Sequence, residues 1–253
     1  MRLADADSGS RRPTAEVEAE VERVFELADY RRQVGDLYAQ LRSRGVDEDS
    51  WQRWTTERAQ LLASHPQSPL IEPDGTFQAA PDYFDYDPTW RVVGRVEPLP
   101  DADKGDGNED DRGDGAEHRP PPGVLLSPDG ASAFNHVGTV VFERLGVEHR
   151  LGLFWLDAYS GGLFLPFKDL TNGDSTYGAG RYLLDAAKSA DLGSAVDNAV
   201  EAEHGPLLLD FNFSYHPSCA WNPRWQCPLA PPTNRLDVEV EAGERVSSPG
   251  NHH

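Results

Sequence analysis

The chain has 253 residues, with 43 Asp and Glu against 23 Lys and Arg and a formal net charge of −20. Such a length allows one large domain or two small ones with a real core. The charge argues against nonspecific binding to DNA or RNA and against docking on anionic lipid, because both surfaces would repel it. No apolar run approaches the roughly 20 residues that span a bilayer, and the first residues lack the apolar core of a signal peptide. We therefore expect a cytoplasmic protein that binds neither nucleic acid nor membrane.

The cationic residues are almost all arginine, since only Lys104, Lys168 and Lys188 are lysines. Abundant carboxylates with scarce lysine are typical of proteins dissolved in molar salt, where carboxylates hold water and ions and the salt screens their mutual repulsion. A GC-rich genome is the alternative explanation, because GC-rich codons also favour arginine. On the salt-adapted interpretation, stability should rise with KCl up to molar concentrations.

Two helices are predicted near the N-terminus. Apolar residues recur at helical spacing after Thr14, which is a plausible N-cap, and Gly45 is a natural stop. A second helix is expected to be capped by Asp49 or Ser50 and to end before Pro66. The Arg and Glu side chains of both helices are interpreted as a solvated face.

The rest of the chain has the alternating and short apolar runs of β-structure. Leu145 and Gly146 predict a tight turn between two of the strands. The fold class is therefore α+β, mainly antiparallel β, with N-terminal helices followed by a curled sheet, barrel or sandwich, of about seven strands. The predicted strands are 90–98, 137–143, 147–156, 162–167, 206–213 and 236–242, with a short strand or helix start at 181–185.

The predicted organisation is one β-rich domain behind the helices. Residues 101–123 are rich in Asp, Glu and Gly without large apolar side chains, so they cannot repay their ordering entropy and should form a disordered insertion. A second acidic insertion is expected at 186–205. The divisions are a disordered tail at 1–13, helices at 14–66, the β-rich domain at 67–246 and a disordered tail at 247–253.

Two dense polar and aromatic runs, 167–182 and 209–229, are the candidate functional segments. Arg181 could hold a carboxylate or phosphate bidentately, or it could pair internally with Asp169 or Asp210 beside a positive φ at Gly178 or Gly180. Strand geometry would put Asp210 and Asn212 on one face. If that face is buried, Asp210 needs a partner, and Arg181 or Arg235 would serve.

The two cysteines, Cys219 and Cys227, leave several alternatives open. Zinc sites usually pair cysteines two to four residues apart, so this spacing is poor and no metal site is predicted. A disulfide is sterically allowed but disfavoured in a reducing cytosol. A reactive Cys219 would need a base such as His216. The alternative without a function is that both cysteines are small buried hydrophobic residues under a proline-rich loop.

At these motifs the chain resembles a known family. The segments 68–70, 83–88, 167–169, 176–183, 209–212, 227–236 and 242–244 are similar, in this order, to the bacterial and archaeal family called domain of unknown function 1684, over roughly residues 50–245. Within that family the chain most resembles the haloarchaeal members, which agrees with its acidic composition. Where this chain has Thr233, the family usually has Glu. The resemblance implies domain limits and no established activity.

Two hypotheses on function follow, with no cofactor identified and catalysis undecided. The first is a small-molecule binding or catalytic β-domain, for which an anionic ligand would suit the arginines. Its pocket would hold the candidate catalytic residues Asp210 and Cys219 and the candidate ligand-binding residues Tyr177, Arg181, Asn212, Asn234 and Arg235. The second is a non-enzymatic interaction module whose N-terminal helices hold a partner or form a homodimer, with the polar residues as scaffolding.

Overall fold

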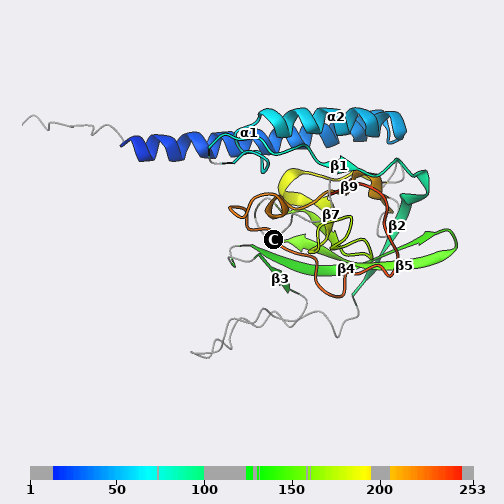
Figure 1. Cartoon of the computed structure of the whole chain (residues 1–253). Helices are drawn as coiled ribbons and strands as arrows, with labels where there is room; N and C mark the ends of the chain where they lie inside the picture. Colours follow the sequence, from blue (N-terminus) through cyan, green and yellow to red (C-terminus); the bar gives the residue numbers. More distant parts are fainter. Residues whose placement is uncertain are drawn as a thin grey trace, which may run out of the picture.

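The computed structural model shows a helical hairpin lying along one side of a curled antiparallel sheet (Figure 1). It describes residues 14–72, 74–99, 124–127, 130, 132–157, 159, 161–194 and 206–246. Both predicted tails, the predicted insertion at 101–123, and residues 195–205 of the second insertion lie outside the described residues.

The hairpin consists of α1 (Ala15–Arg44) and α2 (Glu48–Ser64). Thr14 and Gly45 flank α1 as predicted. The predicted cap of α2 was wrong: Asp47 is the N-cap, and its carboxylate accepts from the amide of Ser50 while the Ser50 hydroxyl accepts from the amide of Asp47, both at 2.8 Å. This reciprocal pair satisfies two amides that a helix start leaves open. Among the described helices none has the length and apolar character to cross a membrane.

All strand pairs in the described residues are antiparallel. The main sheet runs in the order β7-β6-β5-β4-β2-β8, with β3 beside β4, and β1 pairs with β9 in a separate two-stranded sheet. The predicted α+β class is confirmed, with the sheet curled into a half-barrel. The strands are β1 (Asp82–Tyr83), β2 (Arg91–Pro98), β3 (Val124–Leu126), β4 (Ala133–Arg144), β5 (Val147–Leu156), β6 (Leu163–Phe167), β7 (Arg181–Asp185), β8 (Leu207–Asp210) and β9 (Glu244–Arg245).

Local irregularities accompany the curl of the sheet. The register between β4 and β5 shifts between His136 and Gly138, and bulges of this kind bend and twist a strand. Gly138 lies so close to β2 that a Cβ there would stand 2.8 Å from the carbonyl oxygen of Glu97. The predicted turn after β4 is confirmed, because Leu145 and Gly146 have φ of 52° and 80°, as a two-residue hairpin turn requires.

Two apolar clusters hold the layers together. One lies between the hairpin and the sheet, where Trp54 packs edge-on against Tyr38 and Phe213. The other fills the curl of the sheet and includes Val140 and Phe211, both fully buried. The hairpin thus covers one side of the half-barrel by apolar burial, which is the largest favourable contribution to folding.

Two predicted strands were wrong in part or whole. The strand expected at 206–213 ends at Asp210, whose side chain caps a 3-10 turn over Phe211–Phe213. The segment 236–242 forms no strand. There the carbonyl of Val240 accepts from the Arg181 side chain at 2.8 Å and its amide donates to Asp169 at 3.3 Å, so side chains take the place of a neighbouring strand.

Candidate functional site

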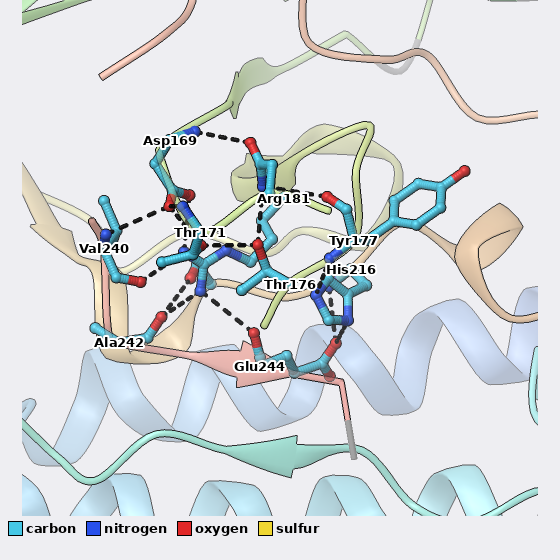
Figure 2. A network of polar contacts seen from close by, with 11 residues as sticks. Asp169, Thr171, Thr176, Tyr177, Arg181, His216, Val240, Ala242 and Glu244 are labelled. Carbon is cyan, nitrogen blue, oxygen red and sulfur yellow. Dashed lines mark hydrogen bonds and ion pairs between the residues drawn. The ribbon is translucent and has the colours of Figure 1, made fainter. Parts of the chain in front are cut away.

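Arg181, the first residue of β7, lies at the centre of a buried polar network (Figure 2). Its side chain is 0% exposed. Nη2 donates to the Asp169 carboxylate at 3.0 Å and to the Val240 carbonyl at 2.8 Å, while Nη1 donates to the carbonyls of Ala242 and Glu244. The sequence left open whether Arg181 holds a ligand anion or pairs internally with Asp169 or Asp210, and in the structure it pairs with Asp169. These contacts fasten the C-terminal segment to β7.

The loop between β6 and β7 folds around the carboxylate of Asp169. Its Oδ1 accepts from the amide of Thr171 at 2.8 Å, and the hydroxyls of Thr171 and Thr176 lie 2.8 Å apart. Gly180 has φ of 104°, and a Cβ there would collide with the carbonyl oxygen of Phe167. A glycine is therefore required at 180, which is one of the two positions that the sequence predicted.

Glu244 on β9 forms a second buried ion pair, which joins the sheet to the hairpin. Arg58 of α2 donates from Nε and Nη2 to Oε1 at 2.9 and 2.7 Å, and the backbone amide of His216 donates to Oε2 at 2.7 Å. The Arg58 guanidinium also lies 4.7 Å from the ring centroid of Tyr215. Both partners are buried, so each charge depends on the other for compensation.

The sequence interpretation of a solvated Arg and Glu face was wrong for Arg58, which is 5% exposed. A signal was present, because Arg58 stands four residues after Trp54 and three before Leu61, and positions so spaced share one helix face. Nothing local identified its partner, since Glu244 lies 186 residues away in the sequence.

Asp210 at the end of β8 is a buried carboxylate, as predicted, but neither predicted arginine is its partner. It accepts from the amide and the side-chain nitrogen of Asn212 at 3.0 and 2.7 Å, and from the Tyr86 hydroxyl at 3.5 Å. Burial raises the pKa of Asp210 to about 6, although the hydrogen bonds from Asn212 oppose this shift. Burial, with a smaller effect of Asp210, raises the pKa of Tyr86 to about 12.

The side chain of Asn212 holds the neighbouring segment 84–87 by bonding to the backbone of Asp87. Its side-chain oxygen accepts from the amide of Asp87 at 3.0 Å, and its side-chain nitrogen donates to the carbonyl of Asp87 at 2.9 Å. Asp210 contacts the same segment through Tyr86. Two residues predicted to bind a ligand or to catalyse thus position a stretch of chain next to them.

That stretch forms one wall of a surface cleft, with residues around 144 and 238–245 on the other sides. Arg144 lies in the cleft with its guanidinium 3.7 Å from the ring centroid of Trp90. Its Nη2 donates to Asp87 at 3.2 Å and to Thr89 at 2.9 Å. Local sequence patterns did not predict this cleft, because its residues come from three separated segments. It is lined by Phe84, Asp85, Tyr86, Asp87, Trp90, Arg144, Val238, Glu239, Glu241 and Arg245.

The two cysteines are unbridged, partly exposed and adjacent in space. The amide of Cys219 donates to the sulfur of Cys227 at 3.3 Å. Hydrogen bonding from Cys219 lowers the pKa of Cys227 to about 7, whereas the neighbouring Cys227 sulfur, together with burial, raises the pKa of Cys219. The imidazole of His216 faces the Glu244 carboxylate, and its Nε2 accepts from the amide of Tyr177 at 3.2 Å.

The remaining candidate residues, Asn234, Arg235 and Tyr177, lie in three separate environments. Asn234 is buried, donates to the carbonyls of Gly152 and Pro166 at 2.8 Å each and accepts from the Gly152 amide at 2.9 Å, so it fastens a loop to the sheet. Arg235 is half exposed and lies 3.8 Å from Asp237. The phenol of Tyr177 points away from the Arg181 network in Figure 2 and interacts with the Cys219 thiol.

The predicted site residues are therefore distributed over several places. Asp210 contacts Asn212, and Tyr177 contacts Cys219, while no hydrogen bond or ion pair within the described ranges joins Arg181 to Asp210, Asn234 or Arg235. Nor do any three His, Cys, Asp or Glu side chains in those ranges stand where they could hold a metal ion together.

These features define an α+β domain in which a helical hairpin covers a half-barrel and buried ion pairs fasten the layers. The chain belongs to the family described as Protein of unknown function (DUF1684), whose model matches residues 76–245, and the predicted family is confirmed. The solution NMR structure of an uncharacterised protein from Haloarcula marismortui is 30% identical, with a TM-score of 0.49, and the match covers 79% of this chain and 94% of that chain. No curated protein matches.

Proposed function

We propose that this domain binds a small molecule in the cleft between segment 84–87, Arg144 and the segment 238–245. The observation that supports this most is Arg144. Its Nη2 is bonded to Asp87 and Thr89, its buried Nε has no hydrogen-bond partner among the described residues, and the guanidinium lies 3.7 Å from the ring centroid of Trp90. An arginine fixed in this way is pre-organised to donate to a carboxylate or phosphate, since little freedom remains to be lost on binding.

The charges of the cleft narrow the class of ligand. Arg144 and Arg245 line it together with Asp85, Glu239 and Glu241. A ligand with an anionic group on Arg144 would meet carboxylates on the other side, so a second group that is cationic or rich in hydrogen-bond donors would fit them. The proposed ligand class is thus a small molecule with a carboxylate or phosphate at one end and donors at the other.

The test is an NMR titration, in molar KCl, of a panel of small amino acids, hydroxy acids and phosphate monoesters. We expect a member of the panel to shift the Trp90 indole signal and the amides of 84–87. Arg144→Gln should weaken that binding by about 10- to 100-fold, because a charge-assisted hydrogen bond is worth about 1.5–3 kcal/mol. The matched control is Arg150→Gln, an exposed arginine of the adjacent strand β5. A panel without a binder, or equal affinity in both variants, would count against the cleft.

A second function is supported by an independent observation on α1. Val17, Val21, Val24 and Phe25 are 51%, 50%, 58% and 72% exposed. They follow one another at spacings of four, three and one residues, so they form an apolar stripe along the helix. The surroundings of this stripe are acidic, with Glu16, Glu18, Glu20 and Glu22 in the same turns.

We propose that a second copy of the chain covers this stripe in an antiparallel helix pair, which places Val17 of one copy near Phe25 of the other. The flanking glutamates repel one another, so the homodimer should form in molar KCl and weaken in dilute salt. Sedimentation at both salt concentrations measures this, with Val21→Asp expected to give a monomer and the exposed Val147→Asp on β5 unaffected. A wild-type protein that stays monomeric in molar KCl would exclude the dimer.

A salt-adapted setting is part of the same proposal. It is supported by the net charge of −20 and by the scarcity of lysine. The same charge supports the absence of nucleic acid as a partner, since phosphates would be repelled.

A further inference from the structure

We propose that Cys219 and Cys227 form a thiol–disulfide exchange site, with Cys227 as the attacking sulfur, Cys219 as the resolving thiol and a low-molecular-weight disulfide as the substrate. The proposal is independent of the cleft, which contains neither cysteine. Its main support is the contact of 3.3 Å from the Cys219 amide to the Cys227 sulfur, made while both thiols are unbridged.

The fold of the loop holds the two sulfurs in reach of each other. Cys219 lies in a 3-10 turn over Ser218–Ala220, and a second turn follows it, in which the amide of Trp225 donates to the carbonyl of Asn222 at 3.2 Å. The thiols of Cys219 and Cys227 also hydrogen-bond to each other, so the two sulfurs are already in contact. A disulfide between close cysteines requires this proximity without a rearrangement of the backbone.

The surroundings distinguish the two sulfurs. Cys227 receives hydrogen bonds from the amide and thiol of Cys219, and the ammonium group of Lys188 adds a favourable charge, which Asp185 partly offsets. The hydrogen bonds and Lys188 outweigh burial and Asp185 and lower the pKa of Cys227 to about 7, so a large fraction is thiolate near neutral pH. The phenols of Tyr177 and Tyr182 are the other titratable groups at the pair.

Both cysteines are partly exposed, so a substrate disulfide can reach the pair. Cys227 is partly exposed and stands in a stretch where Gln226 and Leu229 are exposed. An attacking thiol needs both a thiolate and an open approach, whereas inert structural cysteines are fully buried. Neither cysteine is fully buried, although Cys227 packs against the apolar cluster between the hairpin and the sheet.

The reaction has two steps. The Cys227 thiolate attacks one sulfur of the substrate RSSR, which forms a mixed disulfide, and the departing RS⁻ takes a proton from solvent to become RSH. Cys227 no longer carries a charge, so Cys219 loses its proton more readily and attacks the Cys227 sulfur. This forms the Cys219–Cys227 disulfide and releases the second RS⁻, which is protonated in turn. In sum, two protein thiols are oxidised and one RSSR is reduced to two RSH.

The experiment uses the full reduced chain in molar KCl, with oxidised glutathione as the probe and intact-mass spectrometry as the readout. The wild type should lose about 2 Da without accumulating a mixed disulfide, and dithiothreitol should reverse this. Cys219→Ser keeps a hydroxyl donor beside Cys227 and should accumulate one glutathione adduct. Cys227→Ser should react at least about tenfold more slowly, because Cys219 is a poor thiolate.

Three results would overturn the proposal. They are equal adduct rates in the two single variants, a wild type that carries two glutathione adducts, and a wild type whose mass stays unchanged while an unfolded control reacts. Circular dichroism of each variant verifies that the comparison concerns folded protein.

Discussion

Replacing Arg181 by Met is expected to lower the free energy of unfolding by about 3–5 kcal/mol, the usual effect of removing one partner of a buried ion pair. Met fills a similar volume, so the loss comes from the uncompensated charge of Asp169 and from the carbonyls of Val240, Ala242 and Glu244 that lose their donor. Those carbonyls belong to the segment that carries Glu244, so the second buried pair should loosen with the first. Urea denaturation followed by tryptophan fluorescence measures the change.

The matched control is Arg235→Met, which removes an arginine of the same predicted set. Arg235 is half exposed and 3.8 Å from an Asp237 that is 94% exposed, so the change should stay within about 0.5 kcal/mol. Adding Asp169→Asn to Arg181→Met should cost less than the sum of the two single changes, because no orphaned charge remains. An Arg181→Met protein within about 1 kcal/mol of the wild type would contradict the structural role of this residue.

Local patterns of sequence predicted much of the fold, since the bounds of β5 and β7 and the end of α2 agree with the structure. Each of these depends on apolar periodicity within the element or on a proline that follows it closely. The strand expected at 236–242 failed for a nonlocal reason: the Arg181 side chain, about sixty residues earlier, occupies the backbone groups that a strand would pair. Alternation in sequence carries no information about such a competitor.

The candidate site illustrates the same limit. The sequence selected residues rich in hydrogen-bonding capacity, and in the structure Asp210, Asn212 and Asn234 do make dense contacts. Whether those contacts face a ligand or the chain itself depends on which segments meet there, as with Arg144 and segment 84–87. The pairing of Arg58 with Glu244 likewise follows only from the docking of the hairpin on the sheet.

Asp210→Asn is expected to change the pH dependence of stability more than any other single substitution proposed for this chain. Burial raises the pKa of Asp210 to about 6 from an ordinary value of 3.8. A raised folded-state pKa means that the neutral form is favoured in the folded protein. The neutral Asp210 side chain contributes its full stabilisation below the pKa that it has in the unfolded chain, and this stabilisation is lost as the pH rises through about 6.

A shift of about two pKa units corresponds to about 3 kcal/mol at a fully buried residue. Asn keeps an oxygen to accept from Asn212 and cannot ionise, and its nitrogen can donate to the Tyr86 hydroxyl. The stability of the wild type relative to Asp210→Asn should therefore fall by about 3 kcal/mol between pH ~4 and pH ~7 and then level off.

Urea denaturation in molar KCl across this pH range measures the difference between the two proteins, so the titration of the other carboxylates cancels. Asp237→Asn is the control, because the exposed Asp237 should give a difference that does not vary with pH. A flat difference for Asp210→Asn would show that the carboxylate is solvated in the folded protein. A slope of the opposite sign would show that it is stabilised as an anion, with Arg91, whose charge opposes the shift, outweighing burial. In either case Tyr86, in the wall of the cleft, would not be held below pH 6 by a hydrogen bond to a neutral Asp210 carboxyl group.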